Sequence, residues 1–530
     1  MSEEKQNPEE LAENATAEAD TIFGDVPQRN ENVKKGGISK NTKFLIIGIC
    51  FLIGLSAGFV AVNMMNKNTE TGIDESSLLD NLTDDDSKSI VLNDGTTNNV
   101  TKIQVKNADE FTVIQKEKAK GDGEKPVYAV EGYDDINFDN DLLYTLANNG
   151  SGLSATELIE ESPSDLNKYG LEKPLAEVAL TYADGNVFRL KVGDPSPIVS
   201  GKSYCECNGN VYLVMTSYLM NYQKTADQFI SKTVLEEPSD ADYPIVESVR
   251  IQRKDLDWDI YLEYDYEGAN DDTAGGTAAT HMMLEPIFSY LNVEKSVNVT
   301  NGIFGLSAEE IAVIHPEEQD FDKTGLSDPF CTLTVQCDNG EEYHLTIGDS
   351  YKTESGKNCY YTCLDGVNLI YGVTADNDVW ATVQPKDIAS ANIFSTNVWT
   401  LAELDVSAGG ISLQFEGEGT EQSNYVVTKN GEECDTERFR LLYRFLLSIY
   451  GEEFYIGELP EGEPDGEVHV LSQNGRDDYT ISFYRISDLK TIVARNGVAS
   501  YIIRSSALDT LIHNLGIFDN LEEEFKTSWQ

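Results

Sequence analysis

An internal repeat constrains the fold of this chain more than any other feature of its sequence. Residues 170–202 and 325–357 align without a gap at a constant offset of 155, and ten of the 33 aligned positions are identical. Self-similarity at a fixed period indicates that one supersecondary unit is used more than once. We therefore expect at least two copies of one structural module.

The residues shared by the two copies are mostly those that begin, end or connect strands. They are Gly170, Leu171, Pro174, Gly185, Gly193, Asp194 and Gly201 in the first copy, and Gly325, Leu326, Pro329, Gly340, Gly348, Asp349 and Gly356 in the second. The Asp-Gly and Asn-Gly pairs favour tight hairpin turns, and the flanking apolar residues alternate with polar or small ones, as in half-buried strands. Each copy is predicted to be a meander of about four antiparallel strands, with these residues in structural roles.

A third, more divergent copy is predicted at residues 464–503, where the order of strands and turns recurs without the Gly-Leu-x-x-Pro start. Strands and a helix are also predicted before each copy, with the helices at 141–147, 283–291 and 436–449. The last is the clearest, because its apolar residues fall on one face after a capping Asp435. Helices laid across antiparallel sheets predict an α+β fold.

A separate segment near the N-terminus has the composition of a membrane span. Residues 44–65 contain no charged side chain, and about 22 helical residues reach roughly 33 Å, enough to cross a bilayer. Four lysines and no acid occupy residues 34–43, whereas seven acids and one lysine occupy 66–87. Lysine is retained on the cytoplasmic side. A single transmembrane helix with a cytoplasmic N-terminus is predicted; a cleavable signal peptide fits less well, because the apolar run is long and begins late.

These observations predict six segments. They are a disordered cytoplasmic tail (1–43), a transmembrane helix (44–65), a flexible acidic stalk (66–100), and three α+β repeat modules (101–235, 245–397 and 405–520). Residues 66–530 are expected outside the cytoplasm, and the lipid bilayer is a predicted partner through 44–65.

The charge balance excludes some classes of partner. The chain carries 92 acidic residues against 39 lysines and arginines, a formal net charge of −53. A nucleic-acid-binding surface needs clustered lysine and arginine, so nucleic acid is not an expected partner. The acidity is interpreted as solvation that keeps the body soluble.

The repeat resembles the bacterial family catalogued as domain of unknown function 4340. The matching residues are Tyr169 to Pro174, Val192 to Asp194 and Gly201 to Tyr204 in the first copy, with Thr324 to Pro329, Ile347 to Asp349 and Gly356 to Tyr361 in the second. The resemblance covers roughly residues 140–400 well and the last 120 weakly. It implies a membrane-anchored extracytoplasmic protein, often encoded beside an ABC-type exporter, and it implies no catalytic residue.

No catalytic, cofactor or metal site is predicted. The five histidines form no zinc-binding pattern, and no phosphate-binding glycine loop is present. Seven cysteines follow the apolar segment, at a spacing that matches no metal site. Free thiols are the favoured interpretation, but Cys337 and Cys363 could approach across one meander, and the disulfide state is not predicted because connectivity cannot be derived from sequence. Asp194 and Asp349 are the nearest approach to a recurring acidic site, but a turn-capping role explains both.

The leading hypothesis is a non-enzymatic accessory or interaction protein, whose partner is a transporter complex if the family association holds. Two alternatives stay open. One is an extracytoplasmic hydrolase of cell-wall polymers that uses a pair of carboxylates, and the other is a surface ligand-binding or adhesion protein. The oligomeric state is not predicted.

Overall fold

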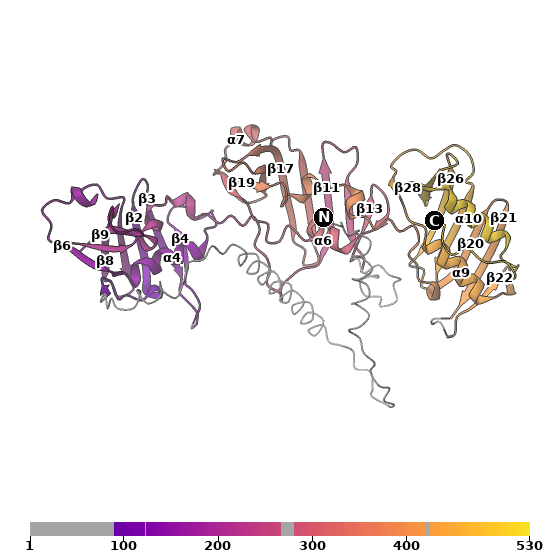
Figure 1. The fold of residues 1–530 in the computed structure, drawn as a ribbon, viewed down its shortest axis with the longest axis horizontal. Coiled ribbons are helices and arrows are strands. Elements are labelled where there is room, and N and C mark those ends of the chain that lie inside the picture. Colours follow the sequence, from indigo (N-terminus) through magenta and orange to yellow (C-terminus); the bar gives the residue numbers. More distant parts are fainter. Residues whose placement is uncertain (1–88, 122, 267–279, 420, 422, 530) are drawn as a thin grey trace, which may run out of the picture. The chain divides into compact units, whose positions relative to one another are not determined.

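The computed structural model describes residues 89–121, 123–266, 280–419, 421 and 423–529 (Figure 1). The described residues form three large antiparallel sheets, together with one sheet of two short strands, β1 (Ile90–Val91) and β5 (Ser154–Ala155). The pair β1–β5 places residues 90–91, which belong to the predicted stalk, in regular structure.

The first sheet has eight strands in the spatial order β4-β3-β2-β7-β8-β9-β10-β6. Their bounds are β2 Val100–Lys106, β3 Glu110–Glu117, β4 Val127–Val130, β6 Glu157–Glu161, β7 Ala176–Tyr182, β8 Val187–Pro195, β9 Lys202–Cys207 and β10 Asn210–Met215. Buried and more exposed side chains alternate along β7 and β9, and Val105, Val178 and Leu190 are buried on one face. Such alternation places every second side chain in the core.

Helix α4 (Asn140–Ser151) lies against the buried face of the first sheet. It begins after Asp139, whose side chain accepts hydrogen bonds from the backbone N–H groups of Asp141 and Leu142. Leu143 and Leu146 on α4 are fully buried. Gly150 lets the end of the helix approach the sheet, because a Cβ there would clash with the side chains of Leu180 and Tyr222.

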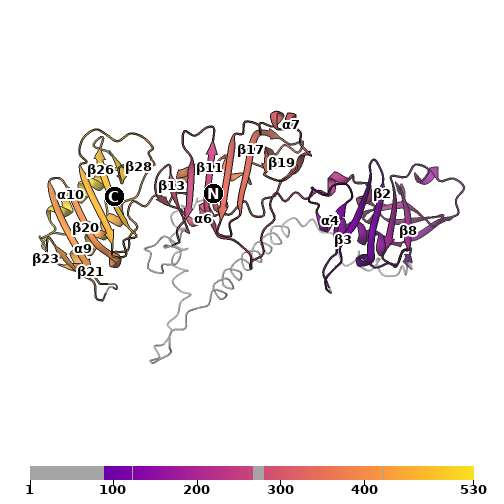
Figure 2. The ribbon, with the colours of Figure 1, turned by 180° about the vertical axis from the view of Figure 1, so that it is seen from behind.

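The second and third sheets repeat this design with nine strands each (Figure 2). In the second, the order is β14 (Ser289–Tyr290), β13 (His281–Glu285), β12 (Ile260–Tyr264), β11 (Val246–Arg253), β16 (Cys331–Cys337), β17 (Glu342–Lys352), β18 (Asn358–Leu364), β19 (Leu369–Thr374) and β15 (Glu310–Ile314). In the third, it is β23 (Glu432–Glu433), β22 (Val426–Lys429), β21 (Ile411–Glu418), β20 (Leu401–Ala408), β25 (Gly466–Ser472), β26 (Asp478–Arg485), β27 (Lys490–Arg495), β28 (Val498–Arg504) and β24 (Glu453–Phe454).

We call each large sheet together with its helices a unit, and the helices of the second and third units are short. The second unit contains α6 (Val293–Thr300), α7 (Glu318–Lys323) and α8 (Pro385–Ile388), and the third contains α9 (Thr436–Leu447) and α10 (Ser505–Gly516). Helix α9 confirms the predicted helix at 436–449. The helix predicted at 283–291 is wrong: most of that segment lies in β13 and β14, and α6 begins only after Asn292, whose side chain caps it.

The prediction of an α+β fold led by a transmembrane helix is wrong, because the part of the chain that the structure describes is mostly β. The strands predicted to precede each meander pair edge to edge with it, since β2 hydrogen-bonds to β7. Their alternating apolar residues then enter the same core, so one large sheet forms in which strand outweighs the helix packed on it. None of the helices described is long and apolar enough to cross a membrane. The predicted span at 44–65 lies outside the described residues.

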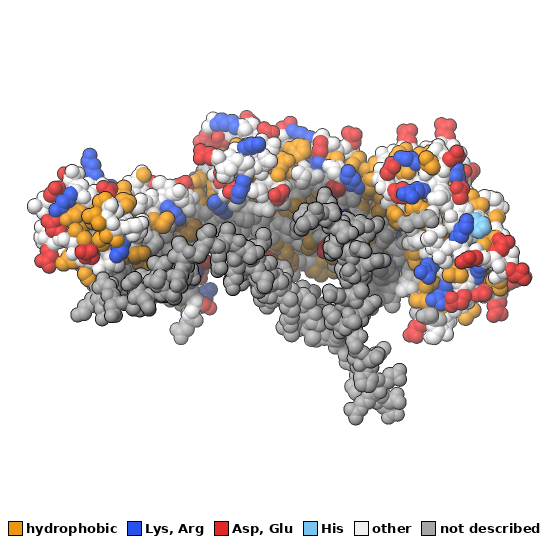
Figure 3. All heavy atoms as spheres, in the orientation of Figure 1, with side chains coloured by type: hydrophobic (Ala, Val, Ile, Leu, Met, Phe, Trp, Pro, Cys, Tyr) orange, Lys and Arg blue, Asp and Glu red, His pale blue; other side chains and the backbone are white. Residues whose placement is uncertain are grey.

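Acidic side chains are spread over the visible face of the described residues and alternate there with fewer basic ones (Figure 3). The whole chain has a formal net charge of −53.

Candidate functional site

The glycines and aspartates shared by the repeat lie where one segment of backbone packs closely on another. We call this arrangement of Gly170, Gly193 and Asp194 the clasp. The pairing of β8 with β9 shifts register between Val192 and Pro195, and Gly193 lies at this bulge. A Cβ on Gly193 would clash with the carbonyl oxygen of Tyr169, and a Cβ on Gly170, whose φ is +68°, would clash with the carboxylate of Asp194. The segment before β7 therefore packs directly on the bulge.

The second copy contains the same clasp. The register of β17 against β18 shifts between Ile347 and Ser350, and a Cβ on Gly348 would clash with the carbonyl oxygen of Thr324. The backbone N–H of Asp349 donates a 2.8 Å hydrogen bond to that same carbonyl. Close backbone packing therefore accounts for the glycine of the Gly-Asp pair in both copies.

The other repeat residues also have places in the backbone. Leu171 and Leu326 are buried in small clusters separate from the main core. Pro174 and Pro329 each precede the strand that begins two residues later. The remaining glycines adopt positive φ in turns with open space around them; they are Gly185, Gly201, Gly340 and Gly356. The structure brings these residues to turns and bulges, and not to one shared pocket.

The histidines and cysteines form no metal site among the described residues. His344 and His469 lie in strands and contact Glu342 and Asp478 on the surface. All seven described cysteines are free thiols. Cys205 and Cys207 share the buried face of β9, and burial raises the pKa of Cys207 to about 11. A thiol that is hard to ionise is a poor nucleophile.

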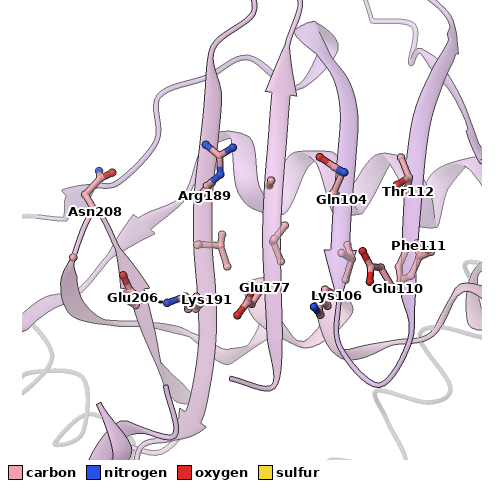
Figure 4. Close-up of a pocket in the computed structure, with 15 residues that line it drawn as sticks. Gln104, Lys106, Glu110, Phe111, Thr112, Glu177, Arg189, Lys191, Glu206 and Asn208 are labelled. Atoms are coloured by element: carbon pink, nitrogen blue, oxygen red, sulfur yellow. Dashed lines mark ion pairs between the residues drawn. The ribbon is translucent and has the colours of Figure 1, made fainter. Parts of the chain in front are cut away.

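A groove of about 500 Å³ lies on the first sheet. It lies on the open face, defined here as the side of the first sheet opposite to α4, where long polar side chains project from β3, β2, β7, β8 and β9 (Figure 4). Gln104, Lys106, Glu177 and Arg189 are exposed there, whereas the intervening Val105 is buried on the other side.

Charged side chains of alternating sign cross the open face from strand to strand. In spatial order this charged row consists of Glu110, Lys106, Glu177, Lys191 and Glu206, which are direct cross-strand partners throughout. Lys191 Nζ lies 2.8 Å from Glu206 Oε2, in an ion pair without hydrogen-bond geometry (Figure 4). Opposite charges placed side by side stabilise neighbouring strands modestly.

The other two sheets serve as internal controls for the charged row. The positions of Lys106, Glu177, Lys191 and Glu206 correspond by register to Gln252, Thr332, Thr346 and Cys363 in the second sheet. In the third sheet they correspond to Ser407, Glu467, Ser482 and Ala494. The shared fold therefore does not require the charged row, because two copies of the sheet form without it.

Sequence reasoning missed this groove. Its residues lie on five strands between positions 104 and 209, and only the register brings them together. The sequence shows only that every second residue of these strands is polar. That pattern is the same for any sheet face that contacts solvent.

Residues 129–301 match the model of a family described as a domain of unknown function (DUF4340). The matched segment runs from β4 of the first sheet to α6 of the second unit, and so it contains most of the groove strands but not β2 and β3. No curated protein and no solved structure matches the chain.

Proposed function

On the premise that the chain belongs to the DUF4340 family, we propose that it is a non-enzymatic recognition protein that binds its partner on the open face of the first sheet. The charged row carries this proposal. Of the four positions compared, the second sheet keeps no charged residue and the third keeps only Glu467, so folding of the sheet does not explain the complete row in the first.

The balance of charge on the open face supports recognition of a partner with both signs of charge. The groove is lined by three acids and three bases, namely Glu110, Glu177, Glu206, Lys106, Arg189 and Lys191, in a chain with 92 acids and 39 bases. A strongly anionic partner would meet the glutamates, and a strongly cationic one would meet the lysines. Electrostatic complementarity of this kind gives specificity more than affinity.

The arrangement of carboxylates favours binding over hydrolysis. Glu110 and Glu177 are two strands apart, roughly 9.5 Å, which falls at the upper limit for an inverting glycosidase. In such an enzyme the attacking water and the scissile bond occupy the space between the two carboxylates. Here Lys106 projects between them, and Lys191 separates Glu177 from Glu206 in the same way.

Site-specific photo-crosslinking tests the proposal. A photoreactive amino acid at Thr112, on the open face of the first sheet, is compared with one at Gln414, its counterpart by register in the third sheet. In cells that express the full chain, we expect an adduct from position 112 and none from 414. Lys191→Glu should abolish that adduct. Equal adducts from both positions, or an adduct insensitive to Lys191→Glu, would contradict the proposal.

The family resemblance also supports a partner in a membrane transporter complex and a location of the body outside the cytoplasm. Co-purification of the full chain from mild detergent with a permease and an ATPase is the expected result. Protease added to intact cells should degrade the body. If the chain purifies alone, the transporter partner is contradicted. If the chain stays intact until the cells are lysed, the location outside the cytoplasm is contradicted. The crosslinking experiment would still test the groove in either case.

A further inference from the structure

The groove on the open face contains an arginine without a partner. Arg189 is exposed on β8 and forms no hydrogen bond or ion pair with another residue that the structure describes. The side chain of Glu177 on the neighbouring strand β7 is also exposed, and it forms no hydrogen bond or ion pair with the residues that the structure describes. In a chain with more than twice as many acids as bases, a guanidinium that no carboxylate satisfies is available to a ligand.

Ala179 is a small residue among the long side chains that line the groove. Ala179 is the direct cross-strand partner of Gln104 on one side and of Arg189 on the other, and all three residues line the groove. A methyl group between two long side chains leaves space above the sheet. The volume of about 500 Å³ is in the range that holds small ligands.

Opposite charges lie on adjacent sides of this space. Glu177 pairs with Lys191 and Ala179 pairs with Arg189, so Glu177 and Arg189 are diagonal neighbours, with Cβ atoms roughly 7–8 Å apart. Their long side chains let both charged groups reach one small molecule above Ala179. Arginine binds a carboxylate through two parallel N–H donors, whereas Glu177 accepts hydrogen bonds from an ammonium group.

We infer that the space above Ala179 binds a zwitterionic ligand, an amino acid or short peptide, whose carboxylate pairs with Arg189 and whose ammonium group pairs with Glu177. This inference rests on the proposed function and names the chemistry of its ligand. A phosphate would be repelled by Glu177 and Glu110. A sugar would lack an aromatic platform, because the only aromatic residue of the groove lining, Phe111, is 6% exposed.

The equivalent positions of the other sheets are already engaged. Thr334 replaces Ala179 in the second sheet, and its Oγ1 lies 3.2 Å from Nδ1 of His344, the counterpart of Arg189. His469 replaces Ala179 in the third sheet, and its Nε2 lies 3.0 Å from Oδ1 of Asp478. Both replacements put a larger side chain with its own partner where the first sheet has a methyl group.

Four related peptides test the inference by isothermal titration calorimetry with the full chain. The probes are triglycine, triglycine amide, N-acetyl-triglycine and N-acetyl-triglycine amide. We expect triglycine to bind most tightly, and each lost charge to weaken binding roughly tenfold or more. Arg189→Gln should make triglycine and its amide bind equally. Glu177→Gln should make triglycine and N-acetyl-triglycine bind equally.

The controls separate this inference from the proposed function. His344→Gln, at the position in the second sheet that corresponds to Arg189, should leave all four affinities unchanged. If all four peptides bind equally or none binds, the zwitterion inference is overturned, whereas a position-dependent crosslink from Thr112 would still support recognition on the open face. If the crosslink is also absent, both proposals fail. Near-identical circular dichroism of the variants would show that altered binding is not unfolding.

Discussion

Thr362 Oγ1 donates a 2.5 Å hydrogen bond to Oδ2 of Asp378 in the interior of the second unit. Both residues are 0% exposed, and the other carboxylate oxygen of Asp378 has no hydrogen-bond partner among the described residues. Burial raises the pKa of Asp378 to about 7, although the hydrogen bond from Thr362 opposes the shift. Burial raises the pKa of the Cys331 and Cys359 thiols, and the charge of Asp378 adds to both shifts.

The stability of the second unit should therefore depend on pH through Asp378. Because the folded pKa lies above the unfolded one, the folded state binds the extra proton between about pH 4 and pH 7. Stability is fully present below this window and falls as pH rises through it, by up to a few kcal/mol. Urea unfolding at pH 5 and pH 8 should show this loss in the wild type and little of it in Asp378→Asn. Equal losses in both proteins would contradict the assignment.

Substitutions in the clasp should cost stability in both copies. Gly193→Ala and Gly348→Ala each force a Cβ against a backbone carbonyl that cannot move freely, so we expect a loss of about 2–4 kcal/mol in the free energy of unfolding. Gly185→Ala is the matched control, because its Cβ would meet nothing within 4 Å and only the positive φ is strained, at about 1 kcal/mol. Similar losses at 185 and 193 would show that close packing is not the reason for Gly193.

The buried thiols should react slowly with a disulfide reagent. Burial raises the pKa of Cys207, Cys337 and Cys363 to about 11 each, so the thiolate is scarce near neutral pH. Cys434 is the one described thiol that is only partly buried, and it should be modified first. Mass spectrometry of the native chain after brief labelling checks the order, and rapid labelling of Cys205 would contradict the buried position.

Charge reversal on the open face should affect binding far more than stability. The Lys191 side chain is 38% exposed, and half-exposed ion pairs contribute about 1 kcal/mol or less. Lys191→Glu should therefore unfold close to the wild-type temperature while it loses the crosslink from Thr112. Matched thermal scans of the two proteins measure the difference, and a large drop in the melting temperature would show that the charged row is structural after all.

Local sequence patterns were sufficient to predict those elements that depend on interactions between residues close together in the chain. The helix expected at 436–449 is present as α9, because its capping Asp435 and apolar stripe are local signals. The hairpin turn expected at Asp184-Gly185 connects β7 to β8 for the same reason. The helix predicted at 283–291 is wrong because the apolar residues of this segment fit a helix or a strand equally well. The pairing of β13 with β12 decides in favour of a strand.

The charged row could not be read from the sequence. Lys106 and Glu177 are direct partners although 71 positions separate them in the chain, and a shift of one residue would turn each side chain to the opposite face. Nothing near either residue specifies the other. Their juxtaposition follows from the register of β2 against β7.

The sequence alone determined that one module is repeated, which residues make its turns and bulges, and that nucleic acid is not an expected partner, because repeats, turn residues and net charge are properties of the chain itself. Only the tertiary structure decided that the preceding strands join each meander in a single sheet, and that Arg189, Ala179 and Glu177 meet on one face. Strand order and register depend on backbone pairing between distant segments, which minimises exposed apolar surface for the whole sheet at once.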